Sequence, residues 1–304
     1  MKKFLIEHIT LYEYEHEVIL AQHLAYLKPQ SHAWQRLSSH DLTIEPETDN
    51  VQAVTDAFGN HRTFFSISRA HTSLEVRAMS EVLKKPRYLD ANLAKTPPWE
   101  SVRDSMHYSL DQPFDPASEF VWPSPYIPWV ETLKSYARQS FTTSRPIGQA
   151  SLDLCHRIHA DFNYEAGATE IHTPIEKAFE QRKGVCQDFA HIMIGCLRAI
   201  GLPARYISGY LLTSPPPGKP RLRGADASHA WVSVYCPGVA GNWLELDPTN
   251  RTVADLDHIS VAQGRDFGDI SPLRGVIRGG GAHKYQIAVT VEEASSANPS
   301  TVAH

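Results

Sequence analysis

The sequence lacks the cysteine content of a disulfide-stapled protein, and it lacks any long apolar run. Only four cysteines occur in 304 residues, and none forms a C-x-x-C pair, so we expect free thiols. No stretch approaches the roughly 20 apolar residues that a membrane helix requires. The apolar start Phe4–Ile6 ends at Glu7, so we expect no signal peptide, no membrane partner and a cytoplasmic protein.

An excess of charge of one sign is also missing. The chain has 34 acidic and 29 basic side chains, a formal net charge of -5, and no long single-sign run. The basic residues Lys219, Arg221 and Arg223 lie in a proline-rich loop and are too few to indicate a phosphate or nucleic-acid site. We therefore expect no nucleic-acid partner.

The composition that remains is that of a folded globular protein, with 42% hydrophobic and 21% charged residues over a length that suits two domains. Residues 1–90 are predicted to form a β-rich, sandwich-like domain, because short β-branched and aromatic runs alternate with turn residues. Two such runs are Ile9–Tyr14 and Thr63–Ser68. The dipeptide Gly59-Asn60 favours a tight hairpin.

The rest of the chain divides into three regions. Residues 91–145 are rich in proline and are expected to connect the domains, with a helix only near residues 130–140. Residues 146–291 are predicted to form an α+β core of helices packed on an antiparallel sheet. The small polar residues 292–304 indicate a disordered tail.

The core region contains clear helix signals. The first helical pattern runs over residues 152–162. Thr173 as N-cap, Pro174 as the first residue and Glu176 as the third predict a second helix, which should end near Lys183 with Gly184 as the left-handed cap.

A third helix is predicted from Cys186 to Ile200, and it is apolar nearly all round, which is typical of a buried helix. Strand-like runs follow over residues 204–212, 229–236 and 243–247. Short connections between them favour antiparallel pairing.

These elements bring three chemically suited residues together. Cys186 follows a glycine turn at the start of the buried helix, where unsatisfied N–H groups and the helix dipole favour a thiolate and can bind an oxyanion. His229 begins one strand and Asp247 ends the next, so a hairpin places them side by side. Nucleophile, base and orienting carboxylate form the triad of a cysteine hydrolase or acyltransferase.

Four ordered motifs carry a resemblance to a known family. They are Gly184-Val185-Cys186 opening a helix, the run from Leu197 to Tyr210, Ser228-His229-Ala230-Trp231-Val232, and Leu246-Asp247-Pro248-Thr249. The core resembles the bacterial transglutaminase-like superfamily. The first domain, with Asp56-Ala57-Phe58-Gly59-Asn60, is similar to its companion N-terminal region.

The resemblance implies a papain-like α+β fold and a Cys-His-Asp triad on Cys186, His229 and Asp247. It also implies a thioester acyl-enzyme that acts on a peptide or protein amide. Gln187, rather than tryptophan, follows the nucleophile, and no acidic loop has calcium-ligand spacing. We therefore expect water or a small amine as acceptor, and no metal or cofactor.

Other side chains are secondary candidates. Tyr164, Gln187 and Trp231 are candidates for the oxyanion site or the cleft wall, although each also suits a packing role. Asp188 is expected either to cap its own helix or to pair with Arg205.

Competing interpretations come from other classes of protein. Cys155, His156 and His159 share a helix face and suggest a metal site, but no second ligand segment accompanies them. Ser228 beside His229 suggests a serine hydrolase, but adjacent strand residues point to opposite faces. A third alternative is a catalytically idle peptide-binding or scaffold module that keeps the triad.

Overall fold

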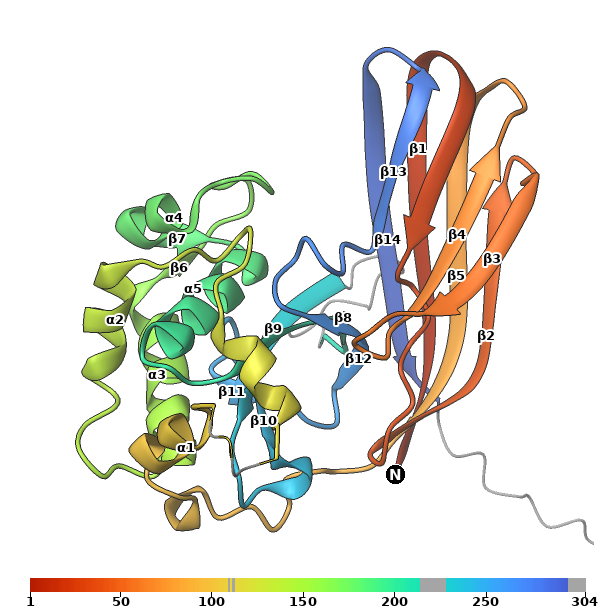
Figure 1. The fold of residues 1–304 in the computed structure, drawn as a ribbon. Helices are drawn as coiled ribbons and strands as arrows, with labels where there is room; N and C mark the ends of the chain where they lie inside the picture. The colour runs from red at the N-terminus through yellow and green to blue at the C-terminus, as the bar shows by residue number, and fades with distance from the viewer. Residues whose placement is uncertain (109, 111–112, 214–227, 295–304) are drawn as a thin grey trace, which may run out of the picture.

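The computed structural model describes residues 1–108, 110, 113–213 and 228–294. Figure 1 shows a tall lobe of long strands beside a lobe of helices and shorter strands. The basic loop residues Lys219, Arg221 and Arg223 lie outside the described residues. Within the described residues, no helix is long and apolar enough to cross a membrane.

The tall lobe is built on one very long strand. Its seven strands are β1 (Lys2–Ala25), β2 (Gln35–Glu45), β3 (Asn50–Thr55), β4 (His61–Ile67), β5 (His71–Lys84), β13 (Leu273–Gly279) and β14 (His283–Glu293). The first half of β1 lies between β5 and β14, and its second half lies between β4 and β13. All of these pairings are antiparallel.

The two halves of this sheet pack into one buried cluster. Phe65 and Ile67 of β4 share it with Leu74 and Val76 of β5, and Val18 lies where β1 passes from one half to the other. Alternating burial along β5 is the pattern of a strand with one face in a core. The β-rich, sandwich-like architecture predicted for the N-terminal region is thereby confirmed.

The C-terminal strands correct the predicted course of the chain. Residues 273–291, which we assigned to the core, lie in strands β13 and β14 of the N-terminal sheet. Strand β14 continues to Glu293, so the first two residues of the predicted tail are ordered, and residues 295–304 lie outside the described part. Local pattern reveals a strand but not its distant partner.

The hairpin between β3 and β4 follows the prediction. Gly59 has φ of +81°, which its missing Cβ permits. Asp56 holds the turn, because its Oδ1 accepts hydrogen bonds from the backbone N–H groups of Phe58 and Asn60 at 2.9 Å.

The proline-rich region contains short elements: η1 (Leu93–Lys95), α1 (Trp99–Ser105), η2 (Pro116–Val121) and α2 (Glu131–Arg138). Helix α2 was predicted, whereas α1 was not. Pro98 occupies the N-cap of α1, where a missing N–H donor does no harm, and Trp99 and Val102 are buried.

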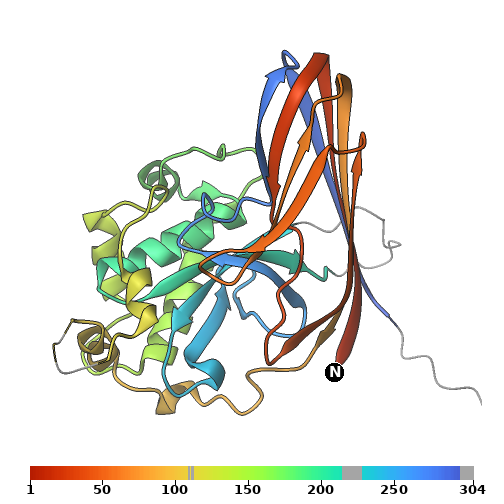
Figure 2. The same cartoon turned by 45° about the vertical axis from the view of Figure 1, so that its right-hand side comes forward.

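The second lobe contains three helices and a five-stranded sheet. Its elements are α3 (Ile147–Asp161), β6 (Asn163–Tyr164), α4 (Ile175–Gln181), β7 (Lys183–Gly184), α5 (Cys186–Ala199), β8 (Ala204–Leu211), β9 (Ser228–Tyr235), η3 (Ala240–Asn242), β10 (Trp243–Asp247), β11 (Thr252–Val253) and β12 (His258–Gly264). The antiparallel sheet has the order β11-β10-β9-β8-β12. Helices α2 to α5 lie on the side away from the strand-rich lobe (Figures 1 and 2). This is the predicted α+β core.

The ends of α4 differ from the prediction. Pro174 occupies the N-cap, and the Thr173 hydroxyl instead accepts a hydrogen bond from the Glu170 N–H. Arg182, with φ of 53°, takes the left-handed position at the C-terminus. Gly184 pairs in β7 instead, and its lack of a side chain has another use, because a Cβ there would lie 2.5 Å from Asp188 Oδ2.

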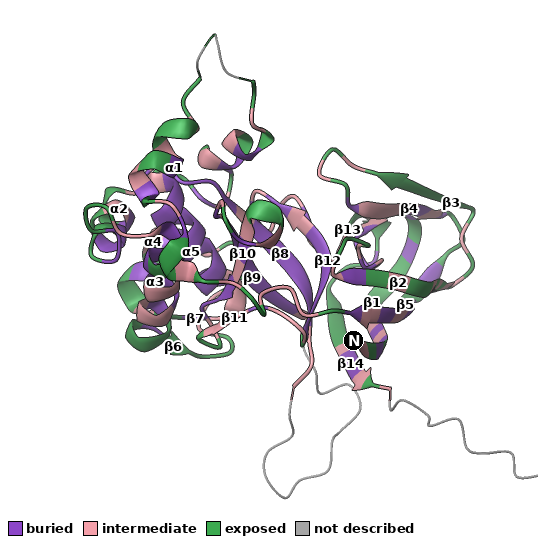
Figure 3. Cartoon of the chain, turned by 90° about the horizontal axis from the view of Figure 1, so that it is seen from below, coloured by how far each residue is buried: buried purple, intermediate pink, exposed green. Residues whose placement is uncertain are grey.

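The two lobes share one apolar interior. Phe4, Ile6 and Val82 of the N-terminal sheet belong to the same buried cluster as the core helices and strands. Buried His8 is 3.0 Å from the Tyr210 hydroxyl of β8. In Figure 3 the buried residues are concentrated in α5 and in the central strands, and α5 packs against strands β8 and β9.

Candidate active site

Cys186 is the first residue of α5, whose residues from position 188 to 198 are all buried. The first N–H groups of a helix have no acceptor within that helix, so Cys186 lies at the end of α5 that carries unpaired donors. Cys186 is partly exposed, whereas Cys155, Cys196 and Cys236 are buried. Burial raises the pKa of each buried thiol, for Cys236 to about 12. Cys186 is therefore the thiol suited to reaction.

Asp188 fixes the turn that presents Cys186. Its Oδ2 accepts hydrogen bonds from the Val185 N–H at 2.8 Å and from the Thr169 hydroxyl at 2.6 Å. Of the two roles expected for Asp188, the structure supports capping, because Arg205 stacks on Trp243 instead.

His229 and Asp247 meet across the sheet. His229 Nε2 donates to Asp247 Oδ2 at 2.7 Å, and both side chains are buried. Burial alone would lower the pKa of His229, but the hydrogen bonds with Asp247 and Cys186 outweigh it and raise that pKa to about 10. With Nε2 engaged by the carboxylate, Nδ1 is the ring nitrogen left for the thiol. The structure thus brings together the three residues that the sequence nominated, and their catalytic role remains a prediction.

Asp247 binds more donors than the triad requires. His258 Nε2 lies 3.0 Å and Asn250 Nδ2 2.7 Å from the same Oδ2 that binds His229. Oδ1 accepts from the backbone N–H groups of Thr249 and Asn250 at 2.9 and 3.1 Å. Burial raises the pKa of Asp247, but the hydrogen bonds from His229 and His258 prevail and hold it well below its usual range. The carboxylate is therefore ionised and fixed in orientation.

His258 and Asn250 were missed by the sequence reasoning. Asn250 follows Asp247 within the motif, so its position three residues beyond the carboxylate was an available signal. His258 is one of 16 histidines and begins β12, at the sheet edge opposite β11. Its approach to Asp247 depends on side chains that reach across the sheet, which no local pattern shows.

The secondary candidates lie in different surroundings. Tyr164 is 57% exposed, and its ring centroid lies 6.4 Å from that of Phe189. Gln187 Nε2 donates to the Ile171 carbonyl at 3.1 Å, so its amide is tied to the loop before α4. Trp231 is fully buried and donates from Nε1 to Glu245 Oε2 at 2.8 Å. Of the two roles considered for Trp231, its full burial favours packing in the interior.

The alternative metal site on α3 is not assembled. Cys155 is buried in the apolar core, while His159 Nδ1 lies 2.9 Å from the Thr249 carbonyl. Among the described residues, the one cluster of three ligand-type side chains is His229, Asp247 and His258, whose ligand atoms lie within 4.8 Å of one another. Both imidazoles already donate to the carboxylate there, so a cation would have to displace those hydrogen bonds.

Comparisons with known proteins agree with this architecture. Residues 4–83 match the bacterial transglutaminase-like N-terminal region, and residues 134–248 match the transglutaminase-like superfamily. An uncharacterized protein of Mycobacterium tuberculosis is 38% identical over 279 residues, which cover 90% of this chain and 87% of that one. An uncharacterized protein of Mycobacterium leprae is 29% identical over 294 residues, covering 96% and 99%.

Two further proteins are similar. A protein-glutamine gamma-glutamyltransferase of Pseudomonas aeruginosa is 35% identical over 128 residues, which cover 37% of this chain and 19% of that one. A solved structure of a proposed cysteine protease from Cytophaga hutchinsonii aligns with a TM-score of 0.73 and 20% identity, covering 96% of this chain and 90% of that one. The latter likeness concerns the fold.

Proposed function

Since this chain belongs to the transglutaminase-like superfamily, we propose that it is a cysteine-dependent hydrolase or acyltransferase that acts on amide bonds through a thioester at Cys186. The observation that carries the proposal is the position of His229, which hydrogen-bonds Asp247 at 2.7 Å and whose pKa is raised by its interactions with both Asp247 and Cys186. A histidine in that position stays protonated beside a thiol and stabilises its thiolate.

The first half of the reaction forms the acyl-enzyme. The Cys186 thiolate attacks the carbonyl carbon of a peptide or protein amide, and first-turn N–H groups of α5 stabilise the oxyanion. The C–N bond then breaks as His229 gives its proton to the leaving amine. The substrate acyl group remains on sulfur as a thioester.

The second half returns the enzyme to its starting state. Neutral His229 takes a proton from water or a small amine, which attacks the thioester carbon. The C–S bond breaks, the acid or new amide leaves, and the Cys186 thiolate and His229 imidazolium are restored. Asp247 keeps the ring in its working tautomer throughout. All of these steps use the protein's own side chains.

The name of the Pseudomonas relative supports glutamine side-chain amides as one substrate class, although that relative matches only 37% of this chain. We propose water or a small amine as acceptor, because Gln187 is anchored to the Ile171 carbonyl beside the nucleophile.

The test compares wild type with Cys186→Ala on an N-acylated glutaminyl-glycine peptide and on casein. Ammonia release, hydroxamate formation with added hydroxylamine, and new peptide termini are measured together. We expect turnover in at least one assay and a loss of at least about a thousandfold in the variant. Cys236→Ala, a substitution of a buried cysteine away from the site, is the control. Equal turnover of Cys186→Ala and wild type would contradict the proposal.

The idle-module alternative makes a different prediction. Such a protein would bind peptides, turn over none of them and show no enhanced thiol reactivity at Cys186. A thioester trapped on Cys186 and observed by intact-protein mass spectrometry would exclude it.

A further inference from the structure

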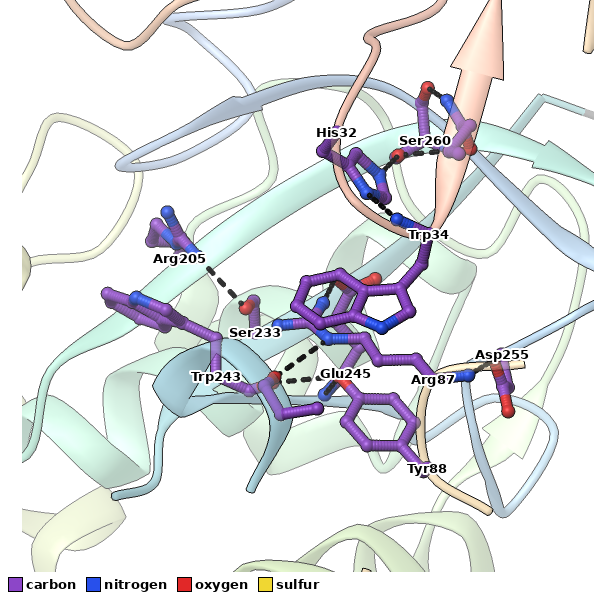
Figure 4. Close-up of polar contacts among 12 residues, drawn as sticks. His32, Trp34, Arg87, Tyr88, Arg205, Ser233, Trp243, Glu245, Asp255 and Ser260 are labelled. Atoms are coloured by element: carbon purple, nitrogen blue, oxygen red, sulfur yellow. Dashed lines mark hydrogen bonds and ion pairs between the residues drawn. The ribbon is translucent and has the colours of Figure 1, made fainter. Parts of the chain in front are cut away.

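A cavity lies between the lobes. It has a volume of about 410 Å³ and is lined from the N-terminal lobe by the segment around His32 and Trp34 and from the core by Arg205, Trp243 and Ser260. Figure 4 shows these side chains around the space, with Arg205 over Trp243 on one side and Arg87 beneath Trp34 on the other. A cavity of this size suits a small molecule.

Two arginines line this cavity, and Arg87 is the one that is paired with a carboxylate. Arg87 Nη1 is 2.6 Å from Glu245 Oε1, its Nε donates to the Ala240 carbonyl, and its guanidinium lies 4.4 Å from the Trp34 ring centroid. The other oxygen of Glu245 accepts from Trp231 Nε1. Arg87 therefore completes a structural network.

The guanidinium group of Arg205 has fewer hydrogen-bond partners than that of Arg87. The Arg205 guanidinium lies 3.5 Å from the centroid of Trp243, and Nη2 makes one long hydrogen bond of 3.5 Å to the Ser233 hydroxyl. Within the described residues, its buried Nε has no hydrogen-bond partner. Glu245, the carboxylate whose charge acts on Arg205, is already held by Arg87 and by Trp231. A guanidinium left in this state costs free energy unless something binds it.

The surrounding groups do not neutralise Arg205. Glu245 pairs with Arg87 and also opposes the charge of Lys84. Asp255 likewise opposes the charge of Lys84, and it accepts from the Arg87 backbone N–H at 2.9 Å. Burial lowers the pKa of His32 to about 4, so at neutral pH it is an uncharged polar group. Arg87, Lys84 and Arg205 thus carry three positive charges against the two negative charges of Glu245 and Asp255, which leaves one positive charge without a counter-charge.

We propose that this interdomain cavity binds a small monocarboxylate, with Arg205 as the residue that holds its charged group. A planar guanidinium fork matches the two oxygens of a carboxylate, and one uncompensated charge matches a monoanion better than a phosphate dianion. Trp34 and Trp243 supply apolar walls for the body of the ligand, while the neutral His32 and Ser260 supply polar contacts. The site is separate from Cys186 and does not depend on its activity.

Calorimetric titration of the full chain with benzoate and with benzamide provides the test. The two probes have nearly the same size and shape, and only benzoate carries the charge. We expect benzoate to bind at millimolar or lower concentration and benzamide at least tenfold more weakly. Inorganic phosphate is the third probe, and it should bind more weakly than benzoate.

Variants then locate the site. Arg205→Gln should weaken benzoate binding at least tenfold, while Arg138→Gln, at an exposed arginine on α2, should bind like wild type. Because the free guanidinium is poorly satisfied, Arg205→Gln should melt no lower than wild type without ligand. Cys186→Ala should bind benzoate unchanged, so failure of the proposed catalysis would not affect this result.

Several outcomes would overturn the proposal. Equal binding of benzoate and benzamide would show that the ligand's charge plays no part. Tighter binding of phosphate than of benzoate would show that the site does not select a carboxylate. If no heat of benzoate binding is detected up to about 10 mM, or if the Arg205 and Arg138 variants bind benzoate equally well, the proposed site does not exist.

Discussion

His258 shares one carboxylate oxygen with His229: its Nε2 lies 3.0 Å from Asp247 Oδ2, which accepts from His229 Nε2 at 2.7 Å. His258 is itself buried, and its ring lies edge-on to Trp231 at a centroid distance of 5.2 Å. Two histidines therefore hold the carboxylate, and the hydrogen bond of His258 reaches the site through Asp247. His258 is a positioning residue in the proposed reaction.

The positioning role predicts different effects for two substitutions. His258→Gln places an amide donor near the position of Nε2 and should keep most activity. His258→Leu removes the donor and should lower kcat about tenfold with little change in KM. The pH dependence of kcat should also shift in His258→Leu, because Asp247 and His229 are coupled. Equal activity and identical pH profiles in both variants would show that His258 is only structural.

Thiol reactivity should single out Cys186. It is partly exposed and interacts with His229, whose pKa it helps to raise, whereas Cys155, Cys196 and Cys236 are buried. We expect iodoacetamide to alkylate Cys186 alone near neutral pH, and His229→Gln to slow this at least about tenfold. Peptide mass spectrometry of time points gives the rates. An unchanged rate in His229→Gln would mean that the pair is not formed in solution.

Loss of the carboxylate should reduce turnover less than loss of the nucleophile. Asp247→Ala removes the carboxylate that orients the His229 ring and accepts a hydrogen bond from its imidazolium form. We therefore expect kcat to fall by about 100-fold or more. His229→Ala and Cys186→Ala should each cost more than this. The measurement is kcat/KM on whichever substrate is turned over, with circular dichroism to confirm folding of each variant. An Asp247→Ala enzyme as slow as Cys186→Ala would assign Asp247 a larger role.

The stability of the fold should depend on pH through His229. Its pKa is raised from 6.5 to about 10, so its stabilisation is complete below about pH 6.5 and is lost as pH rises through about 10. The pKa of Asp247 is lowered from 3.8, so its contribution is present above that value and lost only in strong acid. The difference in unfolding free energy between wild type and His229→Gln should therefore shrink from pH 6 to pH 10. Urea titrations at both pH values measure it, and a difference that grows with pH would contradict the assigned shift.

Gly184→Ala should disturb the first turn of α5. A Cβ at this position would lie 2.5 Å from Asp188 Oδ2, the oxygen that accepts from the Val185 N–H. We expect a loss of about 1–3 kcal/mol of stability and slower alkylation of Cys186. Gly167→Ala is the contrast, because no neighbour lies within 4 Å of its Cβ, and any loss there comes from its φ of +81° alone. Normal alkylation in Gly184→Ala would show that the turn tolerates the shift.

The sequence by itself determined most of the local structure of this protein and the positions of the three residues for which we propose catalysis. Local signals predicted the positions of Cys186 at the start of a buried helix, His229 at a strand start and Asp247 at a strand end, because caps, turns and periodicity are short-range effects. The same signals predicted α2, α5 and the antiparallel strands of the core.

Only the tertiary structure decided which distant segments meet. Strands β13 and β14 pair with residues of β1 that lie 248 to 289 positions away in the sequence, since hydrogen bonds between strands carry almost no local sequence signal. Long-range packing likewise brings His258 to Asp247 and leaves Arg205 short of partners between two lobes. Close approach of side chains from separate elements depends on how the chain folds back, and that contact, rather than the residue type, gives these two residues the roles we infer.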